Sequence, residues 1–173
     1  MTTPQRLSAA QIIALLDLRP LPQEGGLYRE TYRSADTIPA AALPARYARA
    51  DKSFCTDIYY LLGVGDCSLP HRLESDELYH FHLGDPLEMW LLHPDGRAER
   101  IVLGGDLAAG QRVQVVVPAG AWQMSRLCPG GEYALMSVVV APGFDETDYQ
   151  HGNPADLARQ YPAAEEFLNS LGK

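Results

Sequence analysis

The sequence predicts an all-β fold of the sandwich or barrel class, with short helices near both ends. Many short runs rich in β-branched and aromatic residues follow one another at near-regular spacing, which is typical of such folds. Gly, Pro and Asp separate the runs, and the His-Pro-Asp-Gly turn at 93–96 indicates a hairpin. The runs cover residues 54–62, 68–73, 76–83, 86–93, 98–103, 112–117, 122–127 and 133–140.

A helix and a further strand are predicted before this β-rich region. Ser8 and Gln11 have the spacing of a capping box. Apolar residues between 12 and 16 then lie on one helical face, and Pro20 and Pro22 follow. A glycine turn and an alternating strand come next, with the sequence EGGLYRETYRS.

Residues 35–52 are rich in Ala and Pro and lack a clear period, so we expect a loop with a short helical turn. Two short helices are predicted at the other end of the chain. Asn153 is a suitable cap with Pro154 at the first helical position. Pro162 is expected to begin the second helix.

Composition restricts the possible partners. The 173 residues carry a formal net charge of −8, which repels phosphate backbones and anionic membranes, so neither nucleic acid nor membrane is an expected partner. No apolar run approaches the roughly 20 residues of a membrane helix, and the N-terminal segment lacks a signal-peptide pattern. Cys55, Cys67 and Cys128 show no zinc-knuckle spacing. We therefore expect a cytoplasmic protein.

Two motifs carry a resemblance to a known superfamily. Residues 65–84 read G-x5-H-x-L-x3-E-x6-G, which resembles the first cupin motif, G-x5-H-x-H-x3–4-E-x6-G. Residues 118–123, PAGAWQ, resemble the second motif, P-x-G-x2-H. More narrowly, the chain resembles the DUF985 (Cupin_5) family of small single-domain cupins over residues 10–150. The four segments that carry this likeness are EGGLYRETYRS, SDELYHFHLGDPLE, QVVVPAGAWQ and VAPGFDETDY.

The resemblance implies a double-stranded β-helix, the cupin jelly roll. We expect one domain over residues 1–173, with its barrel core at about 24–145. Cupins often pair through N-terminal strands, so Tyr28, Arg29 and Tyr32 are expected at a homodimer contact.

The resemblance also implies a metal site of three histidines and one glutamate, from which this chain departs. His71 and Glu77 match, but Leu73 and Gln123 replace two histidines. Leucine donates nothing to a metal and an amide is a poor substitute for imidazole, so no cofactor is expected. A divalent metal held by His71, Glu77 and an unforeseen ligand is the alternative. Strand parity places His80 and His82 on the face opposite Glu77, which favours an outer-face or interface role.

The candidate catalytic residues are His71 and Glu77. An imidazole exchanges protons near neutral pH, so a pocket histidine is a natural base, with a neighbouring carboxyl as its orienting partner or acid. The alternative is a hydrogen-bonded histidine without chemistry. Candidate substrate-binding residues lie on the neighbouring runs. They are Tyr60, Tyr79, Gln114, Trp122 and Gln123. The alternative for the two tyrosines is a core position with a bonded hydroxyl, which is the more frequent role of tyrosines in such strands.

These observations predict a protein that binds a small molecule. The first hypothesis is a metal-independent epimerase or isomerase that acts on a sugar-like or carbonyl substrate by proton transfer, similar to the sugar-nucleotide epimerase branch of the cupins. The alternatives are a metal-dependent dioxygenase or isomerase and a non-enzymatic binder of small ligands.

Overall fold

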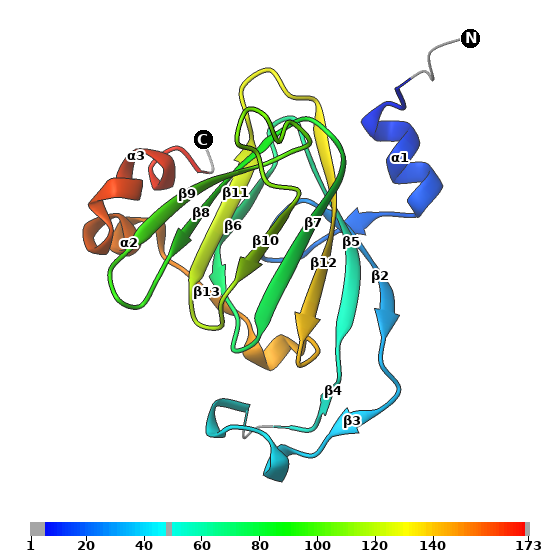
Figure 1. Ribbon diagram of the computed structural model, residues 1–173, viewed down its shortest axis with the longest axis vertical. Coiled ribbons are helices and arrows are strands. Elements are labelled where there is room, and N and C mark those ends of the chain that lie inside the picture. The colour runs from blue at the N-terminus through cyan, green and yellow to red at the C-terminus, as the bar shows by residue number, and fades with distance from the viewer. Residues whose placement is uncertain (1–5, 48–49, 172–173) are drawn as a thin grey trace.

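The computed structural model describes residues 6–47 and 50–171. Two β-sheets pack face to face, and a small two-stranded arm projects from their lower end (Figure 1). The first sheet has the strand order β1-β2-β5-β12-β7-β10, and the second has the order β13-β6-β11-β8-β9. The arm pairs β3 with β4. The predicted all-β class with flanking helices is confirmed. The strands form two separate hydrogen-bonded sheets and not one closed barrel.

The elements have the following bounds. The first sheet contains β1 (Arg19–Pro20), β2 (Leu27–Arg33), β5 (Thr56–Gly63), β12 (Tyr133–Ala141), β7 (Asp76–Gly84) and β10 (Gln114–Val117). The second contains β13 (Gln150–His151), β6 (Cys67–Arg72), β11 (Trp122–Leu127), β8 (Leu87–Leu92) and β9 (Ala98–Leu103). The arm contains β3 (Thr37–Ile38) and β4 (Lys52–Ser53). The helices and 3₁₀ turns are α1 (Ala9–Leu16), η1 (Ala40–Ala42), η2 (Ala45–Tyr47), η3 (Glu146–Asp148), α2 (Pro154–Gln160), η4 (Pro162–Ala164) and α3 (Glu165–Leu168).

Each of the eight predicted β-runs forms a strand, and the strand predicted after the glycine turn is β2. The region predicted as a loop at 35–52 holds the turns η1 and η2 and most of the arm, while its residues 48 and 49 lie outside the described residues. The first five residues of the N-terminal segment also lie outside them. Hairpin formation at 93–96 is confirmed by the bond from the Gly96 amide to the His93 carbonyl, 2.9 Å long.

Helices α1 and α2 begin where the capping residues predict, because side-chain oxygens satisfy otherwise unpaired amides there. Pro162, the predicted start of the last helix, begins the 3₁₀ turn η4, and α3 follows from Glu165. The capping box of Ser8 and Gln11 is complete, and Asn153 accepts bonds from the first-turn amides of α2. Helix α1 packs Ile12 on the outer face of the first sheet, while α2 and α3 cover the outer face of the second. No helix in the described ranges has the length and apolar character needed to cross a membrane.

Strand register decides which side chains face the space between the sheets. In the first sheet, Val140 pairs with both Thr56 and Glu77, and Glu77 pairs with Val117. These four residues form an inward-facing row at the lower end of the sandwich, since residues that are directly opposite share a face. In the second sheet, His71 and Gln123 are cross-strand partners, as detailed below.

A buried ion pair ties the arm to the segment that follows β12. Lys52 Nζ lies 2.5 Å from Asp148 Oδ2, and both side chains are almost fully buried. The same segment is fixed by Phe144, whose amide donates to Thr56 Oγ1 at 3.0 Å and whose carbonyl accepts from Arg33 at 3.0 Å. These contacts hold residues 143–149 over the lower end of the sandwich, where the cavity described below opens.

We expect Asp148→Asn to lower the free energy of unfolding by about 3 kcal/mol, because it leaves the Lys52 ammonium buried without its counter-charge. Urea denaturation measures the loss. The matched control is Asp156→Asn, which removes the charge of a surface ion pair with Arg159 and should change stability by under about 1 kcal/mol. Equal losses in the two variants would contradict the prediction.

Candidate functional site

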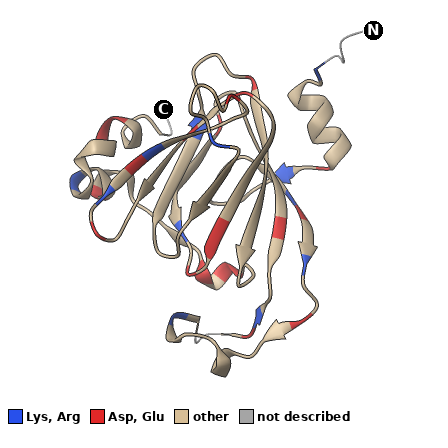
Figure 2. Ribbon diagram, viewed as in Figure 1, with Lys and Arg blue, Asp and Glu red and all other residues tan. Residues whose placement is uncertain are grey.

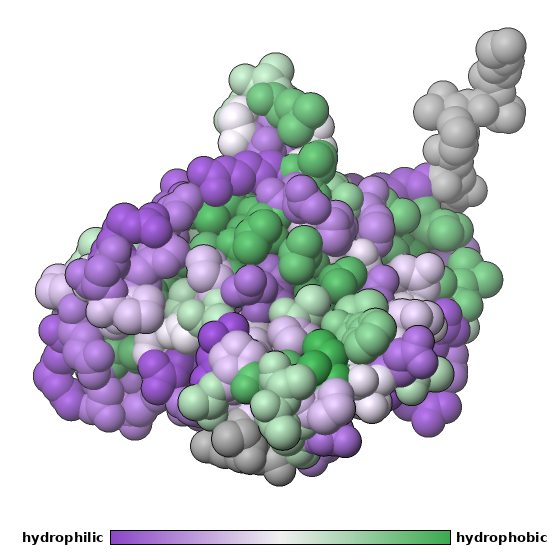
Figure 3. Space-filling view, turned by 60° about the horizontal axis from the view of Figure 1, so that its bottom comes forward, coloured by the Kyte–Doolittle hydropathy of each residue, from purple (hydrophilic) through white to green (hydrophobic). Residues whose placement is uncertain are grey.

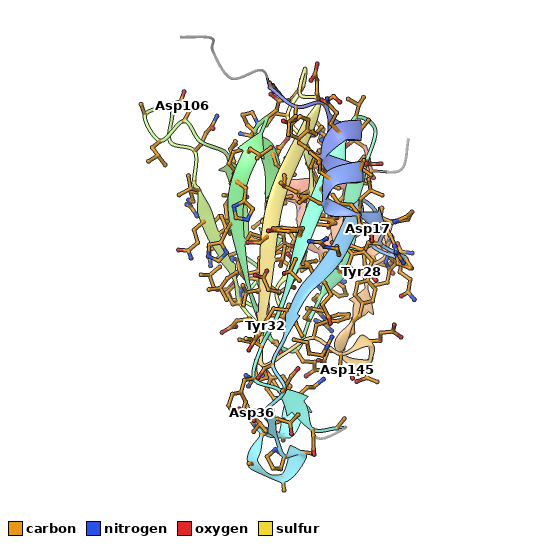
Figure 4. All side chains as sticks on the ribbon, turned by 90° about the vertical axis from the view of Figure 1, so that its right-hand side faces the viewer. Asp17, Tyr28, Tyr32, Asp36, Asp106 and Asp145 are labelled. Atoms are coloured by element: carbon orange, nitrogen blue, oxygen red, sulfur yellow. The ribbon has the colours of Figure 1, made fainter. Side chains whose placement is uncertain are left out.

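A cavity of about 390 Å³ opens at the lower end of the sandwich. Tyr28 and Asp145 both line it and lie on the same side of the molecule in Figure 4. Figure 3 turns this end toward the viewer and shows apolar surface rimmed by hydrophilic residues. The lining combines apolar walls with a few charged and hydroxyl side chains. It consists of Leu21, Tyr28, Glu30, Arg33, Thr56, Ile58, Leu73, Glu77, Tyr79, Val138, Val140, Phe144, Asp145 and Glu146.

Glu77 is the buried carboxyl group of this cavity, and only 4% of the residue is exposed. It comes from the first sheet and meets the second sheet through Gln123, whose Nε2 donates to Glu77 Oε1. Gln123 is itself buried, and its Oε1 has no hydrogen-bond partner within the described residues. A buried polar atom without a partner is unusual in folded proteins, and Gln123 itself does not line the cavity.

His71 lies behind Glu77 and does not line the cavity. Its Nδ1 is 2.8 Å from the carbonyl oxygen of Leu69, an acceptor that requires a proton on Nδ1. The other ring nitrogen, Nε2, is therefore directed toward Glu24, whose Oε2 lies 3.6 Å away. The sequence predicts the imidazole in the pocket with the carboxyl group as its partner. In the structure the Glu77 carboxyl group lines the cavity, and the His71 imidazole lies outside the cavity lining.

Glu24 is a site residue that sequence reasoning missed. Its Oε1 accepts a bond of 2.9 Å from Ser68 Oγ, and its carbonyl accepts from the Leu69 amide. The following Gly25 has a φ of +99°, and a Cβ there would collide with the carbonyl oxygen of Cys67. Only glycine permits this approach to β6. The Gly-Gly pair in the sequence therefore indicated a close backbone contact, but it did not indicate which strand makes the contact.

Tyr149 was also missed as a site residue. Its ring stacks on His71 with centroids 5.5 Å apart and planes 16° from parallel. Its hydroxyl lies 3.3 Å from His151 Nδ1. The segment VAPGFDETDY supported the family resemblance, but nothing local in it indicates contact with a histidine 78 residues earlier.

Burial dominates the electrostatics of the site. The pKa of Glu77 is raised from 4.5 to about 7, mainly because burial removes the carboxyl group from solvent. The charge of His71 lowers this pKa, and repulsion from Glu24 raises it. Burial also raises the pKa of Tyr79 well above 10.0. Near neutral pH, Glu77 therefore exchanges a proton readily while the Tyr79 hydroxyl remains a donor.

The other predicted binding residues divide between the cavity and its surroundings. Tyr79 lines the cavity, whereas Tyr60 is fully buried and donates to the Gly25 carbonyl at 3.0 Å, which is the core role considered as the alternative. Gln114 is exposed on the outer face, 2.8 Å from His80, so its position does not support substrate binding. The cause is parity, because Val115 and Val117 take the inward positions of β10.

Trp122 lies outside the cavity as well. It packs with the C-terminal helices on the outer face of the second sheet, and the Arg72 guanidinium lies 4.4 Å from its ring centroid. Its neighbour Gln123 faces inward, so the same alternation that buries the amide turns the indole outward. Strand parity predicts that His80 and His82 lie on the face of β7 opposite Glu77. This prediction is confirmed, since both histidines lie on the outer face of β7.

The residues at the cupin metal position do not fit a metal. Leu73 contributes an apolar side chain to the cavity wall, and the Gln123 amide nitrogen is engaged with Glu77. In the part of the chain that the structure describes, no three His, Cys, Asp or Glu side chains are arranged to hold an ion.

Comparisons with known proteins support the sequence resemblance. The family model described as "Cupin superfamily (DUF985)" matches residues 10–152. The uncharacterized protein YML079W of Saccharomyces cerevisiae is 31% identical over an alignment of 134 residues, and the match covers 73% of this chain and 67% of the yeast protein.

Two solved structures are similar along nearly the whole chain. A hypothetical protein from Leishmania major has a TM-score of 0.82 at 32% identity, covering 94% of this chain and 97% of its own. Protein SO0799 from Shewanella oneidensis has a TM-score of 0.83 at 32% identity, covering 97% and 99%. The expected family and fold are confirmed.

The raised pKa of Glu77 makes stability depend on pH. Between pH 4.5 and about 7, Glu77 is protonated in the folded state and ionised in the unfolded state. Its contribution to the free energy of unfolding is therefore fully present below pH 4.5 and is lost as the pH rises to about 7. We expect a total decline of about 3 kcal/mol. Urea unfolding across this range should show it in the native chain and not in Glu77→Gln. Parallel profiles for the two proteins would contradict the assignment.

Restoring the missing donors should create a metal site. We expect the double variant Leu73→His, Gln123→His to bind one divalent transition metal per chain, because it supplies three imidazoles and a carboxylate. Elemental analysis after incubation with manganese or nickel measures the content, with each single variant as a control. A double variant that takes up no more metal than the singles would show that the backbone geometry itself is unsuitable.

Proposed function

We propose, from the premise that this chain belongs to the DUF985 (Cupin_5) family of the cupin superfamily, that it is a metal-independent epimerase or isomerase. Its substrate is a small sugar-like or carbonyl compound, from which Glu77 removes a proton at the carbon next to the carbonyl group. The observation that carries the proposal is a buried carboxyl group, facing a cavity, whose pKa is about 7.

Each neighbouring residue has a defined part in this chemistry. The Glu77 carboxylate takes the proton, and the electron pair of the broken C–H bond moves to the carbonyl oxygen as an enolate. The Tyr79 hydroxyl, protonated throughout the working range, donates to that oxygen. Return of the proton from Glu77 to the same face of the carbon restores the original centre, whereas inversion requires a proton delivered by solvent water to the opposite face. In an α-hydroxy carbonyl compound, return of the proton to the former carbonyl carbon, with transfer of the hydroxyl proton to the former carbonyl oxygen, gives the isomer.

The supporting residues hold the base in place and set its proton affinity. Gln123 donates to one carboxyl oxygen of Glu77, which fixes the orientation of the carboxyl group. His71 lowers the pKa of Glu77 while burial and Glu24 raise it, and the balance lies near neutrality. A base is most effective when its pKa lies near the working pH, so the opposing effects support a catalytic carboxyl group better than a purely structural one.

We also propose that the chain forms a homodimer through β2. Only the first two residues of β2 are covered by β1, and the rest of the strand forms a sheet edge within the described residues. Tyr32 on this edge is 54% exposed. A bare edge with an exposed aromatic side chain favours pairing with a second chain.

The proposed function predicts exchange of carbon-bound hydrogen with solvent. Candidate ketoses and small ketones are incubated with the protein in deuterated water, and deuterium next to the carbonyl group is measured by NMR. We expect Glu77→Gln to slow the exchange by at least about 100-fold and His71→Gln to shift the pH at which exchange is half-maximal. Gln114→Ala, on the outer face, is the control and should exchange normally.

Unchanged exchange in Glu77→Gln would remove this residue from the chemistry. Ligands that bind at the cavity but never exchange would support the alternative of a non-enzymatic binder.

A further inference from the structure

The charges that line the cavity are mainly negative. Four carboxyl groups and one guanidinium contribute to the lining, from Glu30, Glu77, Asp145, Glu146 and Arg33. Figure 2 shows acidic residues gathered at the lower end of the sandwich, at the start of β7 and along η3. The field at the cavity mouth therefore opposes the entry of anions.

The single cation of the lining is already committed to protein groups. Arg33 Nη2 donates to Glu30 Oε2 at 2.7 Å, and its Nε donates to Oε1 at 3.2 Å. Its Nη1 donates to the Phe144 carbonyl at 3.0 Å and reaches Ser53 Oγ at 3.4 Å. Four of the five guanidinium N–H groups thus have protein partners, so a phosphate or carboxylate would find one remaining donor here, whereas a bidentate anion site presents two free parallel N–H groups.

The inner end of the cavity adds a second obstacle to anions. Glu77 is buried there, and Glu24 lies on the far side of His71, so the two carboxyl groups already repel each other. A ligand anion would favour the protonated form of Glu77 still further. It would thereby remove the carboxylate that the proposed proton transfer needs.

The walls are suited to an uncharged body. Leu21, Ile58, Leu73, Val138 and Val140 contribute only hydrocarbon to the cavity. Besides the charged residues, the polar residues of the lining are Tyr28, Thr56 and Tyr79, each of which carries a hydroxyl group. Such a lining is typical of small neutral ligands that are oriented by a few hydrogen bonds.

We infer that the ligand is a small uncharged carbonyl compound, free of phosphate and carboxylate groups. The inference rests on the proposed function, since it names the substrate class of the same site. It also sets this cavity apart from one built for sugar nucleotides, because a diphosphate needs cationic partners that the described lining does not supply.

Matched neutral and anionic probes test the inference. We would titrate isotopically labelled protein with dihydroxyacetone and dihydroxyacetone phosphate, and with D-fructose and D-fructose 6-phosphate, following the amide resonances of Tyr79 and Val138. We expect the neutral member of a pair to bind at least about ten-fold more tightly than its phosphate ester, since like-charge contacts cost several kcal/mol. Equal or tighter binding of the esters would overturn the inference, as would a set in which no neutral probe shifts these resonances.

Charge variants locate the cause of the selectivity. Glu30→Gln removes one negative charge and loosens the hold on Arg33, so it should strengthen binding of the phosphate esters by about ten-fold, which exceeds its effect on binding of the neutral ketoses. Glu165→Gln, an exposed residue at the start of α3, removes the same charge far from the cavity and should change neither. Equal effects of the two variants would show that selectivity reflects only the net charge of the protein.

The outcome separates this inference from the proposed function. Neutral probes that bind selectively but never exchange hydrogen contradict the enzyme while the substrate class stands. Anionic probes that bind more tightly and do exchange contradict the substrate class while the enzyme stands.

Discussion

Burial of the Glu77 carboxyl group between the two sheets imposes a constraint that the surrounding side chains satisfy together. A carboxylate taken out of water must gain hydrogen bonds or opposite charge, or it stays protonated. The Gln123 amide donates a hydrogen bond to the carboxyl group, and the charge of His71 favours its ionised form. Repulsion from Glu24 offsets part of this stabilisation of the carboxylate. The resulting pKa of about 7 places the group between its two protonation states under ordinary conditions.

The replacements at the cupin metal position are part of the same balance. A bound cation would keep a neighbouring carboxyl group ionised. With Leu73 and Gln123 in place of imidazoles, the carboxyl group meets hydrocarbon and a neutral amide instead. Under the proposed function, the glutamate that in the cupin motif is a metal ligand serves here as a proton-exchanging group, because two of the other ligands are replaced.

The segment after β12 links the site to the rest of the molecule. Tyr149 stacks on His71, while the adjacent Asp148 is held by Lys52 of the projecting arm. Phe144, Asp145 and Glu146 from the same segment border the cavity. The arm, which belongs to an Ala- and Pro-rich segment of the sequence, thus helps to position residues at the mouth of the site through one buried ion pair.

The sequence by itself determined the strands and the caps of the first two helices, because alternation, capping and turn chemistry are local properties. The family, and with it the expectation that Glu77 faces inward, came from the resemblance of residues 65–84 to the first cupin motif. It could not show that Gln114 and Trp122 face away from the cavity, since either face of a strand can be the inner one until its partners are known. Only the tertiary structure brought Glu24 and Tyr149 to His71. Contacts across 47 and 78 residues depend on how the sheets pack, and no local pattern in the chain encodes that packing.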